Sequence, residues 1–526
     1  MPSTPVLEPT ASAKPRSLLR RLAACYAWLI VAVLVAAGAV LRFHALGQKS
    51  VWIDEGVSIA MARLDWYNLL RILWRHEANM ALYTLLLRFW LPFGDSEAWI
   101  RTLSVLPALA TIPAVYLLGR ILFDARVGLM ASFLVVINAF HVRYSQEARS
   151  YSWFALLCVL SCIYFLKFLD DPSSRNRKGH LLTSVLAVYT HFFAGFIVLV
   201  QWLSLKLVDR REVEPLLKKS WRQFAIAIAP LVIFAASTGV GVLRWIPRPG
   251  WTSLRITAIY LTGGGGERLV WLYAAACGLA IVPLVPALFR FRRVGPGQWR
   301  YRLLAIWLLL PITAVFLISQ WKPCFLARYF IFTVPALALL AAAGIAQLRS
   351  RWLMGAALLL FAAWSLPGVY SLYHKDLDTG REDFRAATRY ILAHSEPNDA
   401  ILFHQPIGRM PFEYYRSLTA PAPYPIVIYP AHGEGLTFKD FYAGPPPQPF
   451  LASVPSHYGR VWVVFTHNEL NRGPDATTSF ISAFYGKQYP ISMREEFQEV
   501  EVRLYCRNSA ASQASCSANV GDSPGK

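Results

Sequence analysis

Long apolar runs separated by short polar segments make up most of the first 370 residues. The first run, residues 22–43, has about the 20 residues that a transmembrane helix needs. An apolar stretch at residues 181–208 is too long for one span and short for two, so it predicts two joined helices that turn near Thr190–His191. The other runs are 99–119, 127–141, 151–169, 223–243, 269–289, 303–319, 330–347 and 352–370. The pattern predicts a polytopic α-helical membrane protein with about eleven transmembrane helices.

Residues 44–97 interrupt this pattern with a mixture of tryptophans, acids, histidine and apolar positions. Within them, Met80 to Trp90 is apolar but has only about half the length of a span. Such a segment is typical of a helix that lies at the membrane surface, here with Tyr83 and Trp90 as anchors. We therefore expect residues 44–97 to be the first exterior loop, with interfacial helices, in a membrane module that covers residues 22–370.

The composition changes again from residue 371, where proline, histidine and acids become frequent and no spanning run recurs. The segment REDFRAATRYILAHSEPNDAILF (residues 381–403) has the pattern of an amphipathic helix, followed by a turn at 397–399 and a short strand. The segments PIVIY, VWVVF and VEVRLY are further strand candidates because they are rich in β-branched and aromatic residues. We expect a small exterior α/β domain over residues 371–507 and a disordered tail over residues 508–526.

Charge refines this topology. Only 16% of the residues are charged, against about 25% in soluble proteins, although the formal net charge is +21. Most lysines and arginines lie in short gaps between apolar runs, which is the positive-inside pattern and argues against nucleic-acid binding. This pattern predicts a cytoplasmic N-terminus at residues 1–21 and an exterior C-terminus.

The seven cysteines form no CxxC or cysteine–histidine spacing, and the histidines form no HExxH motif, so no metal ligand is predicted. Cys506 and Cys516 are close enough in sequence to form a disulfide if the C-terminal region lies outside the cytoplasm.

The segment VWIDEGVSIA places Asp54 and Glu55 just beyond the first apolar run. Ionisable groups near a membrane usually occupy a water-filled cavity or a functional site. One interpretation is a general base that removes a proton from a hydroxyl, with an acidic neighbour that supports it. The other is a pair of solvated loop acids.

Two further polar segments are predicted on the same outer side. HVRYSQEARSY follows the third apolar run, and KPCFLARYF precedes a later one. In the first, Arg149 oriented by Glu147 is suited to hold a phosphate, although lipid headgroups are an alternative ligand. With the weaker candidates Arg244, Arg248 and Arg255, these segments suggest an anionic ligand at the outer leaflet. The candidate substrate- and phosphate-binding residues are His141, Tyr144, Glu147, Arg149, Tyr151, His191, Lys322, Arg328 and Tyr329.

The ordered series WIDEGVS, GDSEAWIR, GRILF, HVRYSQEARSY and KPCFLARYF resembles the GT-C membrane glycosyltransferases. The similarity is to the protein O-mannosyltransferase-like branch, which includes lipopolysaccharide glycosyltransferases and is similar to the aminoarabinose transferase of lipid A. It covers roughly residues 20–370. Where many relatives have a Pro-Pro pair before the interfacial helix, this sequence has EANMALYT, which implies a different acceptor site.

The resemblance implies a sugar transfer from a polyprenyl-phosphate carrier to a hydroxyl of a glycan, lipid or protein, with inversion at the anomeric carbon. Asp54 would be the catalytic base with Glu55 beside it, while Arg149, Lys322 and Arg328 would neutralise the phosphate. A divalent metal is compatible with this chemistry but not implied, because the basic residues supply the positive charge. The expected location is the bacterial inner membrane, with the active site and C-terminus in the periplasm.

Two other classes fit the topology. A transporter or flippase of lipid-linked sugars usually shows inverted repeats and charges at the bilayer midplane. The sequence has no evident repeat, and its charges gather at one face. A non-catalytic scaffold would leave the acids and the basic segments unexplained, so an enzyme is favoured.

Overall fold

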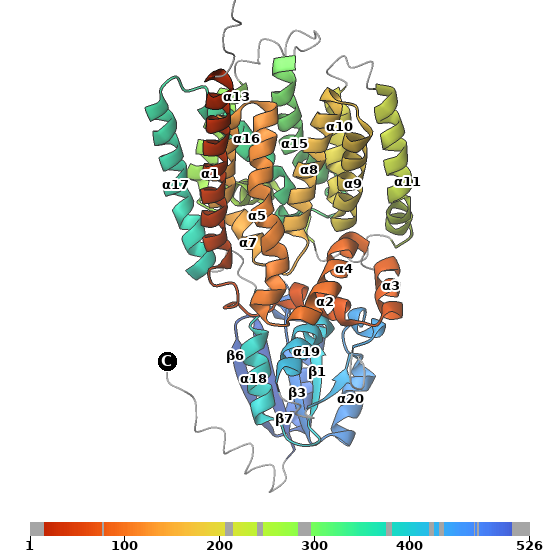
Figure 1. Cartoon of the computed structure of the whole chain (residues 1–526). Helices are drawn as coiled ribbons and strands as arrows, with labels where there is room; N and C mark the ends of the chain where they lie inside the picture. The colour runs from red at the N-terminus through yellow and green to blue at the C-terminus, as the bar shows by residue number, and fades with distance from the viewer. Residues whose placement is uncertain are drawn as a thin grey trace, which may run out of the picture.

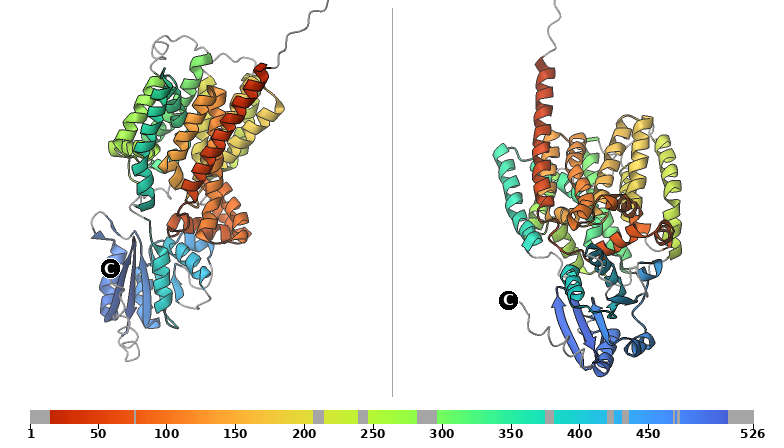
Figure 2. Two further views of the ribbon diagram at one scale, coloured as in Figure 1. Left: turned by 60° about the vertical axis from the view of Figure 1, so that its left-hand side comes forward. Right: turned by 60° about the horizontal axis from the view of Figure 1, so that its bottom comes forward.

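The computed structural model consists of a helical bundle and a smaller α/β domain stacked at one end of it (Figure 1). Both rotated views keep the sheet at that end (Figure 2). The structure describes residues 15–75, 78–205, 214–238, 246–281, 296–374, 381–419, 425–430, 436–467, 469–470 and 473–507.

The bundle is built from helices whose apolar side chains face either each other or the outside. Its elements are α1 (Pro15–Phe43), α5 (Glu97–Leu122), α6 (Ala125–Ile137), α7 (Ala139–Ser145), α8 (Tyr151–Asp170), α9 (Ser174–Thr190), η3 (Phe192–Ala194), α10 (Gly195–Leu205), α11 (Glu214–Thr238), α12 (Trp251–Leu261), α13 (Glu267–Ile281), α15 (Pro296–Ile318), η6 (Ala327–Thr333), α16 (Val334–Ile345) and α17 (Arg351–His374).

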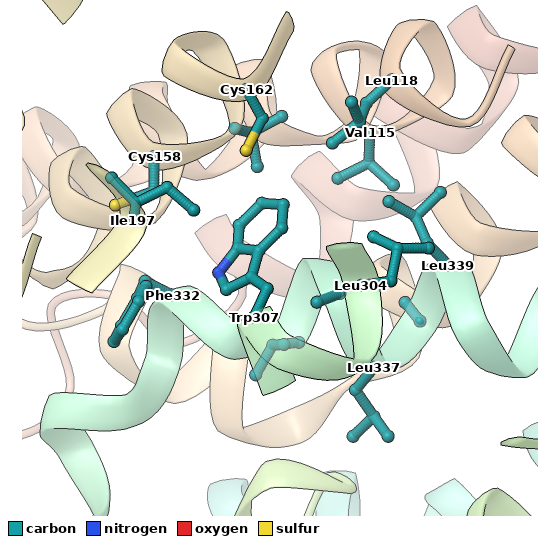
Figure 3. Close-up of a cluster of buried hydrophobic side chains, with 14 of the residues drawn as sticks. Val115, Leu118, Cys158, Cys162, Ile197, Leu304, Trp307, Phe332, Leu337 and Leu339 are labelled. Carbon is teal, nitrogen blue, oxygen red and sulfur yellow. The ribbon is translucent and has the colours of Figure 1, made fainter. Parts of the chain in front are cut away.

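Helix α16 is the centre of the bundle, since every one of its residues is buried. Small side chains let its neighbours approach, and a Cβ on Gly344 would meet the Ala276 carbonyl of α13 at 1.8 Å. The indole of Trp307 fills the space beside Cys162 and Leu304 in the same core (Figure 3). On the outer helices, by contrast, Val40 and Leu359 are more than two-thirds exposed, as lipid-facing residues are.

Each of the predicted spans overlaps a helix or a helix pair, and the chain is a multi-pass membrane protein. Six helices in the described part of the chain are long and apolar enough to cross a membrane, or up to seven if the pair α6 and α7, bent by 63°, is one span. The count of eleven therefore stays a prediction. The predicted break near Thr190–His191 is confirmed, because α9 ends at Thr190 and α10 begins at Gly195.

Short helices connect the bundle to the α/β domain: α2 (Ile53–Arg63), α3 (Trp66–Arg75), η1 (Ala78–Met80), α4 (Ala81–Trp90) and η2 (Leu91–Phe93). The predicted interfacial helix corresponds to α4, but the anchor role of Tyr83 is wrong. Its ring is buried and its hydroxyl hydrogen-bonds Ser104 Oγ at 3.2 Å. The exposed aromatic side chains lie mainly on α3, where Trp66, Tyr67 and Trp74 face outward.

The C-terminal domain has a five-stranded sheet in the order β2-β1-β3-β7-β6, with β1 parallel to β2 and β3, and β7 antiparallel to β3 and β6. The predicted helix and strands are present, whereas β6 was not predicted. The elements are α18 (Phe384–His394), β1 (Ala400–His404), η7 (Pro406–Gly408), α19 (Arg409–Leu418), β2 (Ile426–Tyr429), η8 (Phe438–Phe441), α20 (Gln448–His457), β3 (Arg460–Phe465), β4 (Glu469–Leu470), β5 (Gly473–Pro474), α21 (Ala476–Gln488), β6 (Ile491–Phe497) and β7 (Val500–Cys506).

Close packing and ion pairs join this domain to the connecting helices. A Cβ on Gly56 of α2 would lie 2.7 Å from the backbone of Pro411 on α19, so these two helices touch without intervening side chains. Glu97, at the start of α5, accepts hydrogen bonds from Arg385 and from the hydroxyl of Tyr415. The domain is thus fixed to the segment that carries the predicted acids.

The structure describes only part of the segments to which the two predictions for the chain termini apply. Cys506 is disulfide-bonded, and Cys516 lies outside the described residues, as does the tail at 508–526. Of the predicted cytoplasmic N-terminus, residues 15–21 belong to α1 and residues 1–14 lie outside the described residues.

Candidate active site

Asp54 stands at the first turn of α2, between two arginines from different parts of the bundle. One carboxylate oxygen lies 3.4 Å from Arg328 Nη1 and 3.8 Å from Arg149 Nη2. These separations exceed the roughly 2.7–2.9 Å of a tight charge-assisted hydrogen bond. The Asp54 side chain is 28% exposed, so the acid is paired loosely and open to a reactant.

Arg149 is oriented by α2 itself. Its Nη1 donates to the Asp54 carbonyl at 3.1 Å and to Ser58 Oγ at 3.1 Å. Because α2 holds one edge of the guanidinium, the other edge faces the Asp54 carboxylate. This arrangement fixes a positive charge beside the acid.

Glu55 differs from its neighbour because it is completely buried and both of its oxygens are bound. Arg101 of α5 donates from Nε and Nη2 at 2.9 and 2.7 Å, and the Ala148 N–H donates at 2.7 Å. Burial acts to raise the pKa of Glu55, but Arg101 and these hydrogen bonds outweigh it and hold the pKa below its ordinary value. Glu55 therefore connects α2 to α5 and to the loop that carries Arg149.

Glu147 lies on the other side of that loop, between Arg143 and Arg381. Arg381 comes from the first described residues of the C-terminal domain and forms an ion pair with the Glu147 carboxylate. The ring of Trp52 lies 5.9 Å from the Arg328 guanidinium and 6.0 Å from that of Arg381. One aromatic ring thus lies next to both a cation of the bundle and a cation of the C-terminal domain.

Aromatic side chains form a wall next to these charges. The ring of Tyr151 lies 4.9 Å from that of Tyr144 and 6.3 Å from that of His191, and His191 lies 5.0 Å from Tyr329. These four candidates, which come from α7, α8, η6 and the break between α9 and α10, therefore lie side by side. All belong to the candidate set from the sequence.

Two candidates lie elsewhere. His141 is buried and its Nδ1 is 2.9 Å from Arg42 Nη2 on α1, so it belongs to the contact between α1 and α7. Lys322 is exposed, and its side chain makes no ion pair with any described residue. Of the weaker candidates, Arg255 pairs with Glu267 on the surface, and Arg244 lies outside the described residues.

Glu382 joins this cluster from the C-terminal domain and is not among the residues predicted from the sequence. Its side chain is buried, its Oε2 accepts the Ile53 N–H at 3.4 Å, and its Oε1 is 3.2 Å from His467 Nε2. Arg101 and Arg381 were missed as well. The available signal was an unusual charge density, REDF, directly after the last apolar run.

Among the described residues, no group of three or more histidine, cysteine, aspartate or glutamate side chains is arranged to hold a metal ion. The positive charge of the site comes from arginine. The cluster combines an accessible carboxylate, suited to accept a proton, with guanidinium groups suited to an anion.

Comparison with known structures identifies the architecture. ArnT from Cupriavidus metallidurans in the apo state superposes with a TM-score of 0.59 at 13% identity, covering 91% of this chain and 98% of that one. The same protein bound to undecaprenyl phosphate gives 0.57 at 13% identity, covering 90% and 97%. The chain has the GT-C fold.

Two other comparisons bear on this fold. The archaeal oligosaccharyltransferase AglB from Archaeoglobus fulgidus, in complex with an inhibitory peptide and a dolichol-phosphate, has a TM-score of 0.51 at 12% identity, covering 83% of this chain and 69% of that one. Residues 77–238 match the family model described as dolichyl-phosphate-mannose-protein mannosyltransferase. No curated protein sequence matches significantly. The predicted resemblance to GT-C glycosyltransferases is thus confirmed.

Proposed function

We propose that the protein is a membrane glycosyltransferase that moves a sugar from a polyprenyl-phosphate carrier to a hydroxyl group of an acceptor. The observation that carries this proposal is the Asp54 carboxylate, partly exposed and loosely held between Arg149 and Arg328. The fold supports it, because the similar ArnT structure has undecaprenyl phosphate bound.

In the proposed reaction, the acceptor oxygen attacks the anomeric carbon while Asp54 removes its proton. The bond from the anomeric carbon to the phosphate oxygen breaks, and the electron pair leaves with the phosphate. Arg149 and Arg328 then stabilise the negative charge that develops on the leaving group. A single displacement of this kind inverts the anomeric configuration.

The remaining candidates have supporting roles in this proposal. Within the aromatic wall, Tyr144, Tyr151 and His191 are buried and support the site from behind, while the half-buried ring of Tyr329 is the one on which a sugar can stack. Glu55 holds α2, and Glu147 holds Arg381 and Arg143 at the edge of the site. We place the site on the periplasmic side of a bacterial inner membrane, with a glycan, lipid or protein as the acceptor.

Mass spectrometry of envelope glycans and lipids tests this function. Cells with the gene should carry one sugar residue that is missing from cells without it. A gene encoding Asp54→Asn should fail to restore that mass, whereas Asp95→Asn, an exposed acid on the same connecting segment, should restore it. Restoration of the sugar by Asp54→Asn would refute Asp54 as the base, and identical spectra with and without the gene would refute the transferase.

A further inference from the structure

Glu382 links the proposed base to the C-terminal domain. Its Oε2 accepts the N–H of Ile53, the residue directly before Asp54. The two carboxyl groups, one from α2 and one from the segment before α18, therefore share the same helix end. Arg381, which precedes Glu382, forms an ion pair with Glu147.

The surroundings of Glu382 favour its protonated form. Burial, with further contributions from the negative charges of Asp54 and Glu499, raises the pKa of Glu382 to about 7. Asp54 belongs to α2, Glu499 to the turn between β6 and β7, and the facing His467 follows β3. An acid with this pKa gains and loses a proton near neutral pH, which an ordinary glutamate does not.

Glu382 also lies close to solvent. His467, whose Nε2 is 3.2 Å from Glu382 Oε1, has a side chain that is 53% exposed. In addition, Glu382 lines a cleft of about 360 Å³ between residues 48–50 and the start of α18, together with Arg385, Arg389 and Gln498. The carboxyl group itself is buried, so the half-exposed His467 beside it is the side chain through which a proton can reach solvent without crossing the aromatic wall.

We propose that Glu382 accepts the proton that Asp54 has removed from the acceptor and passes it through His467 to solvent. This inference rests on the proposed glycosyl transfer. The hydroxyl O–H bond breaks as the new oxygen–carbon bond forms, and the proton resides on Asp54. It then moves, directly or through a bridging water, to the Glu382 carboxylate, from there to His467, and finally to water. Each transfer releases one proton and restores Asp54 as a base.

The first test measures sugar transfer in isolated membranes, with the endogenous donor and acceptor, between pH 5.5 and 8.5. Glu382→Gln keeps the shape of the side chain but cannot carry the proton, so transfer should fall about tenfold or more and lose its titration near pH 7. Glu496→Gln, an exposed glutamate on β6 that does not contribute to the raised pKa of Glu382, should retain the wild-type rate and profile. A wild-type rate and pH profile in Glu382→Gln would overturn the relay.

The second test separates proton transfer from a structural role. His467→Ala should lower the rate several-fold, and added imidazole should restore it, because a small base replaces the lost acceptor. Imidazole cannot repair a structural defect, so absence of rescue in a variant with lowered rate counts against the relay.

The third test does not depend on sugar transfer. Infrared spectra of the purified protein should show a carboxyl C=O band that titrates near pH 7 and is missing from Glu382→Gln. No such band in the wild type would overturn the relay even if transfer is confirmed. Conversely, the band could titrate in a protein whose membranes transfer no sugar. That result would refute the proposed function and the relay, although it would still show that Glu382 exchanges a proton near pH 7.

Discussion

Asp54 and Glu55 are adjacent on α2 but belong to two different kinds of site. Glu55 is buried, and its bidentate pairing with Arg101 leaves no oxygen for a reactant. Asp54 is partly exposed, and its arginine partners stand at 3.4 and 3.8 Å. Since successive helical residues point about 100° apart, one turn of helix can present one acid to the protein and the next to a substrate.

The contrast between Asp54 and Glu55 shows how a functional acid is held in place. A buried and fully paired acid supplies rigidity, while the neighbouring acid keeps its lone pairs available. Position in the sequence does not separate the two roles, whereas burial and partner geometry do. Substitutions of the two acids and of their arginine partners should therefore change different properties of the protein.

Asp54→Asn should have the largest effect on transfer and little effect on folding. Loss of a general base typically lowers the rate by about 10²- to 10⁴-fold. The transfer rate in isolated membranes and the unfolding temperature of the purified protein measure the two quantities. A strongly lowered unfolding temperature would show that Asp54 is structural and erase the contrast with Glu55.

Arg101→Met should have the opposite signature. It leaves the Glu55 carboxylate buried without its cation, and breaking such a pair costs about 3–5 kcal/mol of stability. The double variant Glu55→Gln/Arg101→Met should recover part of this loss, because no buried charge then remains. Chemical denaturation in detergent measures both, and equal stabilities for wild type and Arg101→Met would contradict the prediction.

If the proposed polyprenyl-phosphate donor binds at Asp54, Arg328→Gln should weaken the affinity for undecaprenyl phosphate, used as a probe of that donor, by about 10- to 100-fold, the value of one or two charge-assisted hydrogen bonds. Lys322→Gln removes a basic residue from the same segment, but that side chain is exposed, so affinity should change less than about twofold. Titration with undecaprenyl phosphate checks both variants. Equal effects would show that local charge matters more than the geometry around Asp54.

Glu382 should also give the protein a pH-dependent stability. Its pKa is about 7 in the folded protein against 4.5 as the reference value, so the folded state binds more protons between these limits. This contribution to stability is fully present below pH 4.5 and is lost as the pH rises through 7, by at most about 1.4 kcal/mol per pH unit. Compared with Glu382→Gln, the wild type should therefore gain free energy of unfolding when the pH is lowered from 8 to 5.5. A free-energy difference between the two proteins that does not depend on pH would contradict this prediction.

The sequence predicted those parts of the site that come from membrane exits. Asp54, Arg149 and Arg328 follow or precede apolar runs, and charged residues are rare enough there to attract notice. Their meeting depends on helix packing, which a linear pattern does not contain. Lys322 and Arg328, only six residues apart, illustrate this, because one is exposed and the other reaches Asp54.

The missed residues have a different physical cause. Arg101 lies inside an otherwise apolar helix, and nothing in the sequence distinguishes it from the other residues of that predicted span. Arg381 and Glu382 precede an amphipathic helix, where charged residues usually face solvent. Strand β6, ISMREEF, does alternate between outward and half-buried positions. Its charged residues conceal this alternation, because strands are typically rich in β-branched and aromatic residues.

The contact between Arg381 and Glu147 limits how this chain can be rearranged. A graft that exchanged everything after α17 would remove Arg381, one of the two counter-ions of Glu147, along with the outer domain. A graft that replaces only the residues from Phe384 onward would leave Arg381 and Glu382 attached to the bundle of this chain. The boundary that preserves the site therefore lies a few residues inside the outer domain, and chimeras joined on either side of it should differ in whether the bundle retains a complete charge network.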